Sequence, residues 1–289
     1  MSFSFRNGLP PLLRRIFVVL AVYMSPGPGT AISAELQLST AAAYEKYVRL
    51  TEQRIVAELR NADTGAQFLA LDFSAGARAQ AQRESLRRGE IIIEKLRTLE
   101  NKRKIEVADG LIHHWIGAAF IPGVKLDALQ AWLKNYDRHA QYFPEIEKSK
   151  LISGDGTTFK FHYRLKRTKV ITVVYNTEHT VNYLPITARR LASKGVATRI
   201  AQLTDAGKAN EKELPVGDDG GYLWRLNSYW RFEEQDGGIF VECESISLSR
   251  GIPFGVGWLI RGLVESVPRE SLITTLTSLR DGVRRPAAQ

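Results

Sequence analysis

Hydrophobic and polar residues alternate along much of the second half of the chain, and this pattern predicts a long succession of β-strands. Strand-like segments cover residues 111–121 and much of 146–203. Between them, apolar residues recur at helical spacing from Leu126 to Tyr136, and the chain closes on a helix expected to start at Pro268. This order predicts an α+β fold, in which a curved antiparallel β-sheet wraps around a long C-terminal helix.

One β-hairpin is predicted in detail. Residues 224–234 and 239–250 flank the turn Gln235-Asp236-Gly237-Gly238. A turn centred between Asp236 and Gly237 pairs Trp230 with Cys243, and Arg231 with Glu242. Because side chains alternate across a strand, the hairpin has two faces. The apolar face carries Trp224, Leu226, Trp230, Phe232, Val241 and Cys243. The polar face carries Arg225, Asn227, Tyr229, Arg231, Glu242 and Glu244.

The two faces predict different roles. The apolar face is expected to be concave and to face the closing helix, with water on the other side of the sheet. Its candidate pocket residues are Trp224, Leu226, Trp230 and Phe232. The polar face is expected to be a solvated ladder of cross-strand ion pairs. In the alternative, four of its side chains lie inside and orient the polar head of a ligand. These candidate anchors are Tyr229, Arg231, Glu242 and Glu244.

The first 34 residues are typical of a signal peptide. Arg14 and Arg15 precede an apolar run at residues 16–24, and small residues at Ser33 and Ala34 follow a Pro/Gly break. This apolar run is far shorter than the ~20 residues that a membrane-spanning helix needs. We therefore expect a cleaved, soluble chain in a periplasmic or secreted location. Both the general secretory route and the twin-arginine route stay open.

Residues 35–88 are expected to form an N-terminal helix and a linker. Ser39 or Thr40 can cap the helix, and the later part is rich in Ala, Gly, Gln and Arg and lacks strong periodicity. Residues 89–94 predict a strand, to which residues 104–107 could pair back. The main domain is expected to begin with this strand.

No residue pattern identifies a catalytic or metal site. His113 and His114 are adjacent on a predicted strand, so they point to opposite faces and cannot share a metal ion. Cys243, the single cysteine, cannot form an intramolecular disulfide and is expected to be a small buried hydrophobe. A nucleophile elbow, a phosphate-binding loop and a dinucleotide fingerprint are absent from the sequence. We expect no metal and no cofactor.

The formal net charge is +9, and part of the excess lies on one predicted strand. Its basic side chains, which alternate with apolar ones, are Lys160, His162, Arg164 and Lys166. We expect this face to be solvated, with attraction to anionic lipid head groups as the alternative. Nucleic-acid binding is not expected, because it would need aromatic platforms interleaved with the basic groups.

Several segments together resemble a known fold family. They are the strand at 115–122 (Trp-Ile-Gly-Ala-Ala-Phe-Ile-Pro), the helix end Asn135-Tyr136-Asp137, the corner Tyr142-Phe143-Pro144 and the closing helix at 268–283. Over residues 109–285, this layout resembles the START-like superfamily, also called the SRPBCC or polyketide-cyclase-like group, which has the helix-grip fold. Members typically bind lipids, sterols, polyketides or other apolar molecules between the sheet and the last helix, and a minority catalyse cyclisation or hydrolysis there.

The resemblance implies that a domain at residues 89–285 holds an apolar or amphipathic small molecule. Leu272 and Leu276 on the closing helix would touch it, and Phe254 and Trp258 would form a gate that contacts a membrane transiently. The alternatives are a cyclase- or hydrolase-type enzyme in the same cavity and a non-catalytic interaction module. An enclosed apolar cavity favours a carrier, convergent carboxylates with shifted pKa values favour an enzyme, and a solid core favours an interaction module.

The signal peptide leads to a first prediction. The mature chain should begin near Ala34 or Glu35, because the basic, apolar and small-residue segments come in the order that export requires. N-terminal sequencing of protein recovered outside the cytoplasm measures this directly. Recovery of Met1 on the exported protein would contradict it.

Overall fold

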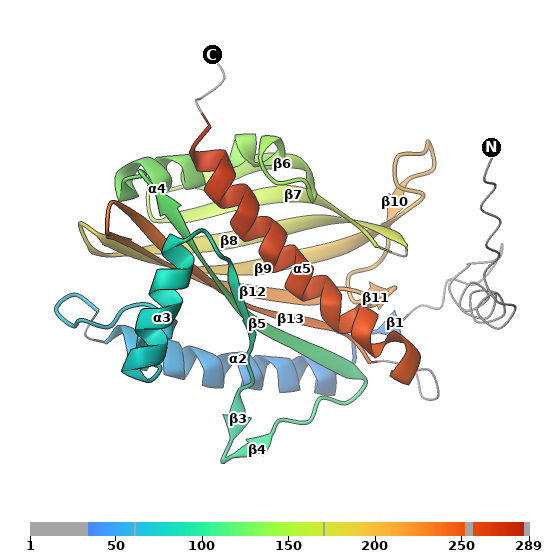
Figure 1. Cartoon of the computed structure of the whole chain (residues 1–289). Helices are drawn as coiled ribbons and strands as arrows, with labels where there is room; N and C mark the ends of the chain where they lie inside the picture. Colours follow the sequence, from blue (N-terminus) through green and yellow to red (C-terminus); the bar gives the residue numbers. More distant parts are fainter. Residues whose placement is uncertain (1–33, 61, 170, 252–256, 286–289) are drawn as a thin grey trace, which may run out of the picture.

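The computed structural model describes residues 34–60, 62–169, 171–251 and 257–285. Within these residues the main sheet has nine antiparallel strands, in the order β2-β5-β13-β12-β9-β8-β7-β6, with β10 added to β9 (Figure 1). The strands are β2 (Ile92–Lys95), β5 (Gly110–Pro122), β6 (Ile146–Gly154), β7 (Thr158–Thr168), β8 (Thr172–Thr187), β9 (Arg190–Thr204), β10 (Lys212–Glu213), β12 (Arg225–Gln235) and β13 (Gly238–Arg250). Two short pairs lie outside this sheet, namely β1 (Ala34–Glu35) with β11 (Asp218–Asp219), and β3 (Leu99–Glu100) with β4 (Arg103–Lys104).

Helix α5 (Gly257–Val283) crosses one face of the curved sheet, as Figure 1 shows, and this confirms the predicted helix-grip arrangement. Leu272, Leu276 and Leu279 are buried against the sheet. Gly117 on β5 permits this approach, because a Cβ atom there would lie 2.7 Å from Cδ1 of Leu276. Helix α4 (Leu126–Lys134) and the 3-10 helix η2 (Tyr136–Gln141) occupy the predicted helical segment between β5 and β6.

The predicted start of the closing helix is wrong. Pro268 lies inside α5, which begins at Gly257. A proline in a helix interior removes one backbone hydrogen bond, so a proline in a sequence usually predicts the start of a helix and not its middle. Here the helix continues through Pro268, and the residues on its C-terminal side are packed against the sheet.

The register of the β12–β13 hairpin is confirmed. Trp230 pairs with Cys243, and Arg231 pairs with Glu242. Asp236 and Gly237 both have positive φ, at 58° and 75°. A two-residue hairpin turn of this kind matches the twist of the flanking strands, which is why the local sequence sets the pairing.

An N-terminal layer covers the other face of the sheet. It consists of α2 (Leu38–Leu59), the 3-10 helix η1 (Ala70–Phe73) and α3 (Gly76–Arg87). Tyr44, Tyr47 and Ile55 of α2 belong to one core cluster with Ile246 and Leu248 of β13. A second cluster joins this layer to the sheet through Phe68, Leu69, Leu86 and Phe240. The segment expected to be a linker is thus part of a packed layer. This layer covers the polar face of the hairpin, so the expectation that water covers that face is wrong.

The expected pairing of residues 104–107 with 89–94 is also wrong. Strand β2 pairs with β5, whereas Lys104 belongs to a hairpin in which β3 pairs with β4. Asn101 and Lys102, both with positive φ, form the turn between β3 and β4. Residues 103 and 104 therefore pair with the nearby β3 and not with the strand at 92–95. In the described parts of the chain, no helix is both long enough and apolar enough to cross a membrane.

Attachment of the N-terminal layer depends on Arg231, which donates to the backbone oxygen of Phe68 at 3.0 Å and pairs with Glu58. Replacing Arg231 with Ala should lower the free energy of unfolding by ~3–5 kcal/mol, because the buried carbonyl of Phe68 loses its donor and the buried Glu242 loses a neighbouring positive charge. Urea denaturation measures the change. Arg88→Ala is the control, since Arg88 pairs with Glu90 on an exposed surface and should cost ~0–1 kcal/mol. Equal losses for the two variants would contradict this account.

Candidate functional site

A cavity of about 540 Å³ lies between the sheet and α5. Its lining comes from β5, η2, β6 to β9, β12, β13 and α5. Leu133 and His139 are among its lining residues, as are Lys169, Tyr222 and Gly251. Tyr222 is 41 % exposed, so this part of the lining reaches the protein surface. The volume falls within the range of small-molecule sites, ~300–1,000 Å³.

The walls are mainly apolar and aromatic. Trp230 and Phe232 on β12 stack with ring centroids 5.8 Å apart. Phe161 on β7 stacks on Tyr136 of η2 at 4.1 Å. All four rings line the cavity. Burial of apolar ligand surface against such walls would supply most of the binding free energy.

Hydroxyl groups form a polar stripe along one wall. Ser245, Ser247 and Ser249 occupy alternate positions of β13 and therefore share its cavity face. Nε2 of His113 lies 2.9 Å from Oγ of Ser249. The hydroxyl oxygen of Tyr175 is buried and has no hydrogen-bond partner among the residues that the structure places. These groups can donate to and accept from a polar group of a ligand.

Two of the cavity histidines, His139 and His179, are neutral near pH 7. Burial lowers the pKa of His139 to about 4 and that of His179 to about 4. One ring nitrogen of His139 lies 3.0 Å from the backbone oxygen of Leu133, and the other contacts the hydroxyl of Tyr163. His179 stacks on Phe161 at 5.1 Å. These two side chains therefore add polar but uncharged groups to the cavity wall.

Charged residues form another part of the lining. Arg167 pairs with Glu145 and lies 3.3 Å from Glu270. Burial raises the pKa of Glu145, although Arg167 and a hydrogen bond from Ser271 oppose this shift. Arg250 stacks over the ring of Tyr222 at 5.3 Å. The cavity wall thus offers charged groups as well as neutral ones.

The residues predicted for the apolar face and the closing helix divide into those that line the cavity and those that lie in the core around it. Leu226, Trp230, Phe232, Cys243 and Leu272 line the cavity. Val241 and Leu276 lie in the adjoining core. Burial raises the pKa of the Cys243 thiol, as expected for a small buried hydrophobe. Phe254 lies outside the described residues, as does the side chain of Trp258, whose backbone belongs to α5.

Trp224 is on the opposite side of the sheet from the cavity, which corrects its predicted place. Its ring packs with Tyr44 and Leu248 under the N-terminal layer. Nε1 of Trp224 donates to a carboxylate oxygen of Asp219 at 3.2 Å. Because Trp224 precedes β12, which starts at Arg225, the alternation of side chains along the strand does not extend to it.

The predicted polar face is buried, so the expectation of a solvated ion-pair ladder is wrong. Arg231, Glu242 and Glu244 are 4 %, 3 % and 3 % exposed, and they lie under the N-terminal layer. Glu242 accepts from the backbone nitrogens of Ala70 and Leu71, at 2.5 and 3.0 Å. These side chains, like Tyr229, which donates to Glu52 at 2.7 Å, face away from the cavity and cannot anchor a ligand there.

Sequence reasoning missed much of the cavity wall. On β7, the basic residues were the predicted feature, whereas Phe161, Tyr163 and Leu165 line the cavity together with Lys166. On β13, the serines at every second position were the available signal for a hydroxyl stripe. His113 and His114 do point to opposite faces, since His113 lines the cavity and His114 bonds to Glu244 at 2.7 Å. Over the described ranges, no group of three or more His, Cys, Asp or Glu residues is placed to hold a metal ion.

Comparison with known proteins gives only distant similarity. No protein-family model and no curated protein matches the sequence. A STAR-related lipid transfer protein from Xanthomonas axonopodis is 14 % identical, with a TM-score of 0.42 over 67 % of this chain and 99 % of that one. The Zhui aromatase/cyclase from a Streptomyces species is 12 % identical, with a TM-score of 0.41 over 61 % and 95 %. A human lipid transfer and protein localization domain is 8 % identical, with a TM-score of 0.39 over 72 % and 95 %.

By their names, these neighbours are lipid transfer proteins and an aromatase/cyclase. The likeness concerns the arrangement of sheet and helix. It says nothing of what the cavity of this chain holds, which depends on the residues described above.

The two tryptophans of the hairpin form a matched pair for a test. Trp224→Ala should lower the free energy of unfolding by ~3–5 kcal/mol and leave binding of an apolar fluorescent probe unchanged, because Trp224 is core on the far face. Trp230→Ala should change probe affinity, because this ring lines the cavity. A probe titration and a melting curve on each variant separate the two effects. Loss of probe binding in Trp224→Ala with no change in Trp230→Ala would reverse the assignment.

Proposed function

We propose that this protein is a binding or carrier protein for an amphipathic, lipid-like small molecule, held in the cavity between the sheet and α5. The observation that carries the proposal is the cavity itself, about 540 Å³ in volume, with aromatic walls and a stripe of hydroxyls. Binding of this kind works by shape and by burial of apolar surface, without covalent chemistry.

The distribution of charge indicates how such a ligand would lie. Its uncharged body would occupy the inner cavity, where His139 and His179 are neutral and the serines of β13 offer hydrogen bonds. Its polar head would lie near Lys169 and Arg250, which also line the cavity. An exposed Tyr222 beside Arg250 also suits a transient contact with an anionic membrane surface.

A carrier is favoured over the two alternatives. An interaction module would be expected to have a solid core, whereas this sheet and helix enclose space. A cyclase- or hydrolase-type enzyme would need a free acid or base in the cavity. Glu145 has a raised pKa, but it is engaged by Arg167 and Ser271. The neutral histidines are engaged as well, His139 by Leu133 and Tyr163 and His179 by Thr177. Export through the N-terminal signal would place the carrier in the periplasm or outside the cell, where it could move lipid-like molecules through water.

Native mass spectrometry of protein purified from its exported fraction, followed by organic extraction of the bound molecule, tests the proposal. We expect an additional mass that is released as an amphipathic small molecule. Ser245→Trp should remove most of that mass, because the ring would occupy the cavity, at a cost of ~1–3 kcal/mol in stability from overpacking.

Thr198→Trp is the matched control, because Thr198 lies on an exposed position of β9. It should retain the bound molecule. Folded Ser245→Trp protein that carries the same mass as the wild type would contradict the proposal, as would wild-type protein that never carries a ligand after exposure to a lipid extract.

A further inference from the structure

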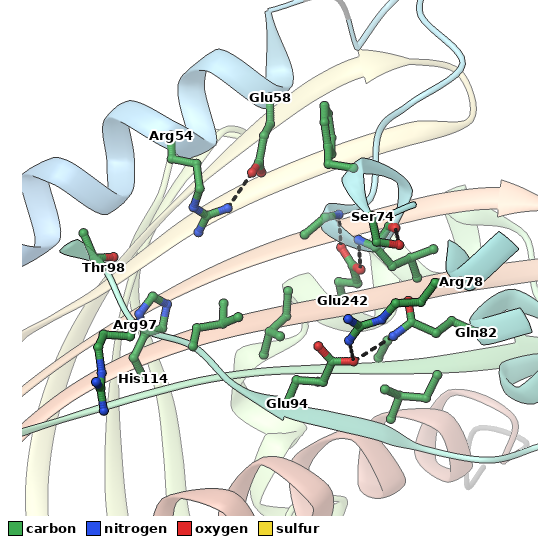
Figure 2. A pocket seen from close by; sticks show the side chains of 18 residues that line it. Arg54, Glu58, Ser74, Arg78, Gln82, Glu94, Arg97, Thr98, His114 and Glu242 are labelled. Atoms are coloured by element: carbon green, nitrogen blue, oxygen red, sulfur yellow. Dashed lines mark hydrogen bonds and ion pairs between the residues drawn. The ribbon is translucent and has the colours of Figure 1, made fainter. Parts of the chain in front are cut away.

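A smaller pocket lies on the far side of the sheet from the cavity, between the N-terminal layer and strands β2 and β5 (Figure 2). Polar groups at its rim are bonded to one another. Arg78 and Gln82 of α3 both donate to Glu94, at 2.6 and 2.7 Å, and Arg54 of α2 lies 2.7 Å from Glu58. A ligand would have to break these bonds before it could use the rim groups. The cavity beneath α5 differs from this pocket, as the hydroxyl groups on its sheet wall show.

Four serines on the sheet wall of the cavity lie together on three neighbouring strands. They are Ser193 on β9, Ser228 on β12, and Ser245 and Ser247 on β13. Ser228 pairs directly with Ser245, and in the strand register it is diagonal to both Ser193 and Ser247. Opposite residues on one face of a sheet are ~5 Å apart and diagonal ones ~7–8 Å. We call these four residues the serine patch.

The hydroxyl groups of the serine patch have no hydrogen-bond partner among the residues that the structure describes. Ser249, the next serine on the same face of β13, is engaged, since its Oγ lies 2.9 Å from Nε2 of His113. Side-chain oxygens that are both unpartnered and sealed off do occur in the described ranges, for example on Asp219, but the serine oxygens are not among them. The patch hydroxyls are therefore free and can be reached from the cavity that they line.

The position of one patch hydroxyl is set by a glycine. Gly195 on β9 pairs with Ser228, and a Cβ atom at this glycine would lie 2.7 Å from Oγ of Ser228. The Ser228 hydroxyl thus lies over Gly195, and a larger residue there would displace it. This hydroxyl therefore points toward β9, the strand that carries Ser193.

Apolar side chains border the serine patch on both sides. Along β12 and the residues just before it, the lining residues are, in order, Phe232, Trp230, Ser228, Leu226 and Leu223. Across the strands, Val181 of β8 pairs with Gly195 and also lines the cavity. The patch is thus a polar island within an apolar wall, near the middle of the cavity along this strand.

The surroundings of the serine patch are uncharged. Ser193 and Ser247 are each 8 % exposed. Among the lining residues that the structure places on β9, β12 and β13, only Arg250 is charged, and it lies at the end of β13. An ionised group is costly to bury without an opposite charge beside it. The patch therefore suits a neutral polar group and disfavours a carboxylate.

Free hydroxyls in an apolar wall set a condition on the ligand. A plain acyl chain in this cavity would displace water from the serine patch and leave its hydroxyls without a partner, and each unsatisfied buried polar group is costly. An oxygen atom on the ligand would restore a hydrogen bond. Because a serine hydroxyl both donates and accepts, it can pair with a hydroxyl or with a carbonyl.

We propose that the cavity selects an amphiphile that carries a neutral oxygen group, a hydroxyl or a carbonyl, in the middle of its apolar body. The serine patch binds this oxygen, and the apolar parts on either side of it lie against Trp230 and Leu226. This inference rests on the proposed carrier function and narrows its ligand class, because an unsubstituted acyl chain is then a poor ligand.

Competition between fatty acids that differ by one oxygen atom tests the proposal. The whole folded protein, freed of bound lipid, is mixed with equal amounts of stearate and one hydroxystearate, and native mass spectrometry measures which of the two is bound. The hydroxyl is placed in turn at carbon 2, 8, 10 or 12. At least one mid-chain isomer should bind about tenfold tighter than stearate, through one restored hydrogen bond. The carbon 2 isomer, whose hydroxyl lies beside the head group, should bind as stearate does.

The double variant Ser228→Ala and Ser245→Ala should bind the preferred isomer and stearate equally, because its wall no longer offers these hydroxyls. Stearate binding by this variant reports that the cavity is intact. Ser153→Ala is the matched control, since Ser153 is exposed on β6 and does not line the cavity. It should keep the preference of the wild type.

Equal binding of stearate and every mid-chain isomer by the wild type would overturn the proposal and leave the carrier function standing. A preference that survives in the double variant would overturn it as well. The same holds if the molecule bound from a lipid extract has no hydroxyl or carbonyl in its body. Failure of the wild type to bind any of these fatty acids or any molecule of the extract would instead overturn the carrier function itself.

Discussion

Strand β13 is buried on both faces along almost its whole length, and the rest of the structure depends on this constraint. A strand in this position presents every second side chain to each of two layers. Toward α5 it offers Val241, Cys243 and the serines of the cavity wall. Toward the N-terminal layer it offers Glu242, Glu244 and the apolar Ile246 and Leu248. One strand thus contributes to the cavity and to the attachment of the N-terminal layer.

The buried carboxylates give the N-terminal layer its position. An ionised side chain under a protein layer is costly unless it is bonded, and breaking such a bond leaves an uncompensated charge. Glu242 accepts two backbone N–H groups of η1, and Glu244 is held by His114 and Arg54. Glu233 on β12 is paired in the same way with Arg83 and Arg190. These bonds fix where each part of the N-terminal layer lies, while its aromatic residues supply the apolar contact.

On the other face of the sheet, side chains do not fill all the space beneath α5, and the remaining cavity is the candidate binding site. The stripe of leucines on α5 packs closely where Gly117 allows it, but elsewhere the curved sheet stands away from the helix and a cavity remains. Burial keeps His139 and His179 neutral, while Arg167, Lys169 and Arg250 add charge to the lining. The same sheet therefore combines a tightly packed polar face with a partly open apolar face.

Local patterns in the sequence determined the α+β class, the hairpin with its register and the opposite orientations of His113 and His114. These follow from side-chain alternation and turn chemistry, which act over a few residues. Only the tertiary structure decided which face of the hairpin met which layer. The distant segment at residues 38–87 covers the polar face, so Arg231, Glu242 and Glu244 are buried ion-pair partners rather than solvated or ligand-facing groups. Trp224 was misplaced for a related reason, since the residue before a strand is positioned by what packs on it, and that contact comes from α2 far away in the chain.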